Sequence, residues 1–81
     1  MAISWLLHHA HAPEECASAY AAWTGFESPL RHRPTMSSCV AGGHAIWWTV
    51  TVTDQEEALA MLPPFVARRT RAIRVSEVLI P

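Results

Sequence analysis

The stretch HAIWWTVTVT, residues 44–53, is the feature that most constrains the fold of this chain. Its residues alternate between two faces and are rich in β-branched and aromatic side chains, which is typical of a β-strand. The face that contains Ile46 and Trp48 is apolar and belongs in a core. The face that contains Trp47 also carries threonines, and it suits a partly solvated pocket or a dimer interface. Gly42-Gly43 fits a tight hairpin turn, so residues 35–41 are predicted as the antiparallel neighbour strand.

The N-terminal segment predicts a strand followed by a helix. Residues 2–9, AISWLLHH, form a short apolar run that is too brief for a buried helix. Pro13 suits a first helical position, acidic residues follow it in the first turn, and Gly25 closes the pattern. We therefore expect a helix over residues 13–24, followed by a loop at ESPLRHRP.

The C-terminal third predicts a second helix and a last strand. Asp54 is a helix N-cap, and Glu57 stands three residues later as in a capping box. Pro63-Pro64 interrupts this helix, so we expect a break there and a further helical piece through about Thr70. The apolar segment AIRVSEVLI, residues 72–80, predicts the last strand.

This element order predicts an α+β fold of the ferredoxin-like βαββαβ type in one domain, residues 1–81. Two split β-α-β units form a four-stranded antiparallel sheet with strand order 4-1-3-2 and both helices on one face. The other face is left bare. Hydrophobic residues make up 51% of the chain and charged residues only 16%, and such surplus apolar surface usually marks an association face. We therefore expect a homodimer.

Composition excludes several classes of partner. The net charge is −1 and all six basic residues are arginines, whereas proteins that bind nucleic acid normally carry a positive excess. No apolar run approaches the ~20 residues of a membrane span. The opening MAISWLL lacks the basic region and cleavage site of a signal peptide, so a cytoplasmic location with reduced cysteines is expected.

The predicted strand directions bring distant histidines and cysteines to one end of the sheet. The first strand ends there and the strand after the double glycine begins there. A two-residue hairpin would also pair Ala41 with His44 and Cys39 with Ile46. Six residues should gather at this end: His8, His9, His11, Cys16, Cys39 and His44.

One interpretation of this end is a transition-metal site. Imidazole and thiolate ligands suit Ni, Cu or Zn. The candidate ligands are His9, His11, Cys16 and His44. Their spacing matches no strong zinc signature. The alternative is that the histidines end a strand at the surface and the cysteines are small buried hydrophobes.

A second interpretation is a cofactor-independent enzyme or a small-molecule binding protein. His11 or His44 has the chemistry of a general base near neutral pH. Trp5, Trp47 and Trp48 provide apolar surface for a ligand pocket. Its polar mouth would combine His9, His11, His44 and Arg74. The residues alone leave open this interpretation, the metal site and a purely structural or accessory subunit.

With this order of elements the chain resembles a ferredoxin-like subunit of the dimeric α/β-barrel superfamily. The segments that carry the resemblance are AISWLLHH, PEECASAYAAW, AGGHAIWWTVTVTD and AIRVSEVLIP. The resemblance implies two sheets packed face to face and small molecules bound between sheet and helices. Members include cofactor-independent monooxygenases, polyketide cyclases, muconolactone-type isomerases, haem-degrading enzymes and small nickel-binding proteins. The chain contains no catalytic motif of these groups, so no functional residue is carried over.

Overall fold

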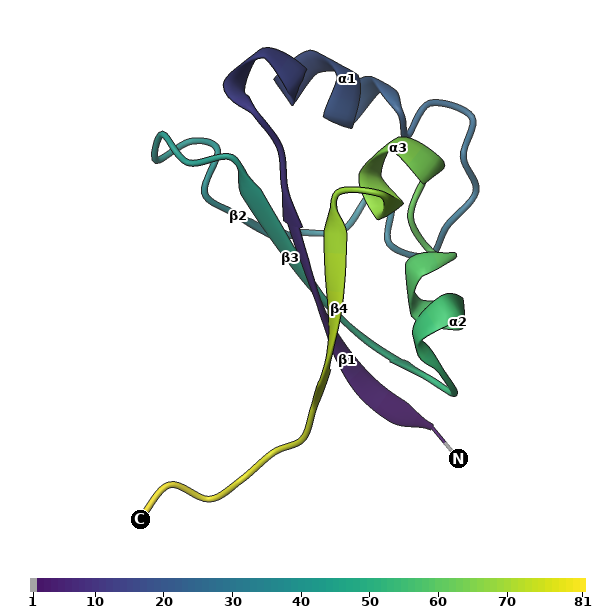
Figure 1. The fold of residues 1–81 in the computed structure, drawn as a ribbon, viewed down its shortest axis with the longest axis vertical. Helices are drawn as coiled ribbons and strands as arrows, with labels where there is room; N and C mark the ends of the chain where they lie inside the picture. Colours follow the sequence, from purple (N-terminus) through teal and green to yellow (C-terminus); the bar gives the residue numbers. More distant parts are fainter. Residues whose placement is uncertain (1) are drawn as a thin grey trace.

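The computed structural model describes residues 2–81 and contains a four-stranded antiparallel sheet (Figure 1). The strands are β1 (Ile3–Ala10), β2 (Met36–Ser37), β3 (Ala45–Val52) and β4 (Thr70–Val75). Their order across the sheet is β2-β3-β1-β4. This is the predicted order 4-1-3-2 counted from the other edge, so the predicted strand topology is confirmed.

The helices are short, and each begins close to the capping residue or proline from which its start was predicted. A 3-10 turn (η1, Pro13–Glu15) leads into α1 (Cys16–Ala21), so the regular helix ends three residues before the predicted residue 24. Helix α2 (Gln55–Leu59) begins after Asp54, whose side chain accepts the Glu57 N–H at 2.8 Å as expected of an N-cap. The prolines then separate α2 from α3 (Pro64–Ala67), which confirms the predicted break.

The turn before β3 is wider than predicted. Strand β2 ends at Ser37, which pairs with Ile46, so the expected pairs Ala41–His44 and Cys39–Ile46 are wrong. The reason is Ser38: its carbonyl accepts the N–H of Gly43 at 2.8 Å and its hydroxyl accepts the N–H of Ala45 at 3.1 Å. These bonds take the place of the next backbone hydrogen bonds between β2 and β3. Gly43 is required because a Cβ there would overlap the Ser38 side chain.

The last strand is shorter than predicted and ends at Val75. Strand β4 pairs only with β1, and Val75 lies opposite Ser4, one residue from the start of β1. Only Ile3 of the neighbouring strand lies beyond that point. Residues 76–81 therefore leave the sheet and extend away from it (Figure 1). This segment exposes three large apolar side chains, those of Val78, Leu79 and Ile80.

The core lies between the sheet and helices α2 and α3. Leu7 of β1 is fully buried and faces Trp48 of β3 across the ladder. The alternating burial of β3 places Ile46, Trp48, Val50 and Val52 on this face, as the alternation predicted. The helices contribute Ala58, Leu62 and Val66.

We expect Leu7→Ala to lower the free energy of unfolding by about 2–5 kcal/mol, because the change leaves a cavity at the centre of this core. Urea unfolding followed by circular dichroism measures the loss. Val40→Ala is the matched control, since Val40 is fully exposed and its truncation should change stability little. Equal effects of the two changes would contradict the placement of the core.

Candidate metal centre

The pairing of β1 with β3 brings two distant histidines together. In this register His9 lies opposite Ile46 and Ala10 opposite Ala45. One residue beyond the ladder, the backbone N–H of His11 donates to the carbonyl of His44 at 3.0 Å. The predicted convergence of His11 and His44 at one end of the sheet is therefore confirmed.

Cys16 reaches the same place through the turn between β1 and α1. The Glu15 carboxylate accepts the N–H of Ala12 at 2.9 Å and forms an ion pair with Arg69 at 2.8 Å. The hydrogen bond from Arg69, followed by the bond from Ala12, lowers the pKa of the Glu15 carboxyl. These contacts fix the chain at the point where Cys16 begins α1.

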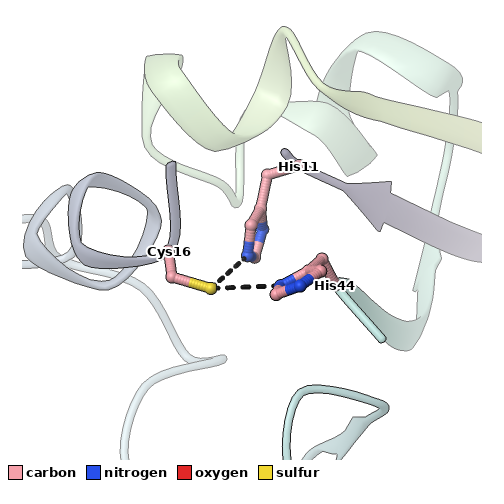
Figure 2. A group of neighbouring side chains, drawn as sticks. All are labelled: His11, Cys16 and His44. Carbon is pink, nitrogen blue, oxygen red and sulfur yellow. Dashed lines mark hydrogen bonds between the residues drawn. The ribbon is translucent and has the colours of Figure 1, made fainter. Parts of the chain in front are cut away.

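His11, Cys16 and His44 form a compact group of two imidazoles and one thiol (Figure 2). The Cys16 sulfur lies 3.3 Å from His11 Nε2 and 3.2 Å from His44 Nδ1. The three ligand atoms all lie within 4.8 Å of one another. His11 is buried, whereas Cys16 and His44 are partly exposed. The group is therefore the surface end of a polar array, a chain of hydrogen-bonded side chains that continues into the interior.

His9 is the buried continuation of this array. Its side chain is completely inaccessible to solvent, and its Nδ1 lies 3.3 Å from the Val66 carbonyl and 3.3 Å from the Thr70 hydroxyl. Its Nε2 lies 2.8 Å from His11 Nδ1. Desolvation by burial, followed by the nearby His11 and Arg69, lowers the pKa of His9, although the Val66 bond and Glu15 oppose the shift. The neutral ring is therefore favoured.

These contacts determine which nitrogen of the His9 and His11 rings carries hydrogen. The Val66 carbonyl can only accept, so His9 Nδ1 must be the donor. In the neutral ring His9 Nε2 is then an acceptor, and His11 Nδ1 must donate to it. A neutral His11 consequently keeps the lone pair of Nε2 directed towards Cys16.

This arrangement has the features of a transition-metal site. A tetrahedral zinc ion, with Zn–N of about 2.0 Å and Zn–S of about 2.3 Å, separates its ligand atoms by roughly 3.3–3.6 Å. Both sulfur–nitrogen distances in the group are close to that range. A metal-bound histidine also commonly donates its second N–H to a further acceptor, and His9 is that acceptor for His11.

Two residues expected at this end lie outside the group. His8 points to the other side of the sheet, because adjacent residues of a strand point in opposite directions, and it stacks on Trp47 with ring centroids 5.4 Å apart. Cys39 lies in the wide turn and accepts a hydrogen bond from the Tyr20 hydroxyl at 3.4 Å. Hydrogen bonds from Ser37 and Tyr20 lower the pKa of the Cys39 thiol.

The structure distributes the predicted pocket residues over both faces of the sheet. Trp5 and His9 lie on the helix-covered face, where Trp5 pairs with Arg74 across the ladder. Trp48 is on the same face and is buried in the core. Trp47 occupies the opposite face, because adjacent residues of a strand point in opposite directions. Trp47 and Trp48 together line one hollow, whereas Arg74 lines another.

Val66 and Thr70 were not identified from the sequence as parts of this array. Val66 acts through its backbone carbonyl, which also accepts the Thr70 hydroxyl at 2.6 Å. A backbone acceptor has no signature in side-chain identity. The Arg69–Glu15 pair was also missed, although a cluster of arginines after α3 and two glutamates after Pro13 were visible signals.

Comparisons with family models, curated proteins and solved structures find no match to this chain. Over residues 2–81, no helix has the length and apolar character needed to cross a membrane.

We expect the stability of the protein to fall as the pH drops below about 6.5, the ordinary pKa of histidine. The folded-state pKa of His9 is lower, so the unfolded chain takes up a proton first. The loss should continue until the folded-state pKa is reached and then level off. Urea unfolding between about pH 8 and about pH 5 measures this slope.

His9→Gln provides the matched comparison for this slope. Glutamine has a donor and an acceptor but does not titrate, so the variant should show a flatter pH profile over the same interval. A wild-type profile as flat as that of the variant would contradict a buried neutral His9.

Proposed function

We propose that the protein binds a transition-metal ion through His11, Cys16 and His44. The observation that carries the proposal is the approach of one thiol to two imidazole nitrogens, at 3.3 and 3.2 Å, from three separate parts of the chain. The hydrogen-bonded His9 supports it, because it holds His11 in the tautomer that presents Nε2 as a ligand.

The donor set favours zinc, copper or nickel. Two imidazoles and a thiolate are borderline to soft ligands, whereas magnesium and calcium prefer carboxylate and carbonyl oxygens. The thiol loses its proton when it binds the metal. Of these ions we commit to Zn²⁺, because both sulfur–nitrogen distances are close to those of a tetrahedral zinc site.

A tetrahedral zinc ion held by three protein ligands would have one further position for water or another small ligand. The partial exposure of Cys16 and His44 would allow solvent to reach the ion. Zinc sites with three protein ligands and an open position are typical of catalysis, where the metal lowers the pKa of bound water. The proposal is therefore a reactive rather than a purely structural metal site.

We expect the metal-free protein to bind Zn²⁺ with a dissociation constant below about 1 μM, which corresponds to about −8 kcal/mol. Competition with a chromophoric chelator measures the affinity. Co²⁺ should give an intense sulfur-to-metal absorption band together with tetrahedral ligand-field bands, and Cys16→Ser should abolish the sulfur band.

Matched variants separate the ligands from other residues of the same type. His11→Ala and His44→Ala should each weaken binding by more than about a hundredfold, which exceeds the usual effect of losing an outer hydrogen-bond partner. His8→Ala and Cys39→Ser should leave the affinity unchanged, because neither residue belongs to the group. Wild-type binding weaker than micromolar, or unaltered by Cys16→Ser, contradicts the proposal.

A second copy of the chain is the partner that we propose for the face of the sheet opposite the helices, in the manner of a ferredoxin-like dimeric α/β barrel. Ladder pairing places Leu6, Trp47 and Ile73 on that face, and Leu79 and Ile80 of the C-terminal segment are exposed. A stable dimer typically buries ~1,200–2,000 Å² in total, which an uncovered four-stranded sheet can provide. Its paired sheets would complete the barrel.

We expect sedimentation at tens of micromolar to give the mass of two subunits. Leu6→Glu should shift the protein to one subunit, because a carboxylate would be buried in the interface. Thr53→Glu, in the exposed turn after β3, should leave the mass of two subunits unchanged. A single-subunit mass for the unmodified chain would contradict the dimer.

A further inference from the structure

A cavity lies beside α1, apart from the metal centre. It has a volume of about 320 Å³ and is bounded by α1, the beginning of β3 and the loop around residues 30–35. Its floor is apolar and buried, formed by Leu30, Ile46 and Trp48. Ligand cavities commonly measure ~300–1,000 Å³, so this one has room for a small molecule. None of the three proposed metal ligands lines it.

The walls of this cavity are aromatic. Trp23 and Tyr20 of the α1 region line it together with Trp48. The Trp23 and Trp48 ring centroids lie 5.9 Å apart with their planes inclined by 48°, and Trp23 also meets Phe26 edge-to-face at 6.1 Å. These contacts hold the Trp23 ring in place before any ligand arrives. Rigid aromatic walls favour a planar ring as the occupant.

The rim of the cavity is positively charged. Arg31, His32 and Arg33 line it on the loop side. Arg31 donates to the Phe26 carbonyl at 3.3 Å and Arg33 to the Pro29 carbonyl at 3.4 Å. Over residues 2–81 the only ion pair joins Arg69 to Glu15, so both rim arginines are without a carboxylate partner.

We propose that this cavity binds a small aromatic carboxylate. The ring would lie among Trp23, Trp48 and Tyr20, and the carboxylate would accept hydrogen bonds from the rim arginines. A guanidinium has five N–H donors, and each arginine uses one on a backbone carbonyl, so donors remain for a ligand. The chain as a whole has a net charge of −1, so its net charge does not by itself attract an anion.

The first test uses benzoate and two analogues with the unmodified protein. Benzamide keeps the ring but lacks the charge, and cyclohexanecarboxylate keeps the charge but lacks the planar ring. Titration calorimetry and ¹H–¹⁵N spectra follow binding, and the indole N–H signals report on the tryptophans separately. We expect benzoate to bind at least about tenfold more tightly than either analogue and to shift the Trp23 and Trp48 signals but not that of Trp47.

Substitution of the rim arginines provides the second test. Arg33→Gln and Arg31→Gln should each weaken benzoate binding by about tenfold, the effect of losing one charge-assisted hydrogen bond. Arg33→Lys should retain part of the affinity because it keeps the charge. Arg71→Gln is the matched control, an exposed arginine of β4 outside the cavity, and it should bind benzoate as the unmodified protein does.

The proposal is overturned if benzoate does not bind, or if benzamide or cyclohexanecarboxylate binds equally well. It is also overturned if Arg71→Gln weakens binding as much as Arg33→Gln does. The analogue series uses the unmodified chain, so it remains decisive even if an arginine variant fails to fold. Benzoate binding should persist in Cys16→Ser, so failure of the metal proposal and failure of this one are distinguishable.

Discussion

The register between β1 and β3 is the constraint on which the rest of the structure depends. A shift of one residue would move Leu7 out of the core and turn His9 towards the bare face, because side chains alternate along a strand. The observed register instead buries Leu7 against Trp48 and carries His9 inward on the same face. It also ends where the backbone of His11 meets that of His44. The hydrophobic core therefore determines the geometry of the polar array.

Burial of His9 is costly unless both ring nitrogens find partners. Val66 and Thr70 satisfy one nitrogen and His11 satisfies the other. Since the neutral ring has one donor and one acceptor, the partners at one end dictate the direction of hydrogen bonding at the other. The Val66 carbonyl of α3 accepts from His9, so His11 must donate to His9. The Nε2 of a neutral His11, which faces Cys16, is then left without hydrogen.

The strand topology and the convergence of the histidines were predictable from the sequence, since both follow from strand order and from the alternation around Trp48. The turn before β3 was not, because Ser38 ends the ladder with its own carbonyl and hydroxyl. The cavity beside α1 was not predicted either. It depends on a loop that carries Arg31 and Arg33 over the core face. Loop paths of this kind leave no periodic pattern.

Helix α1 links the two candidate sites. Cys16 and Tyr20 are one turn apart on it, so any contact that orients this helix orients a metal ligand and a cavity wall together. A helix of six residues is not stable in isolation and must be held by tertiary contacts. Arg69 contributes to that support: it pairs with Glu15, donates to the Phe65 carbonyl at 3.0 Å and lies 3.7 Å above the Phe65 ring. An arginine that touches neither site therefore positions the helix that serves both.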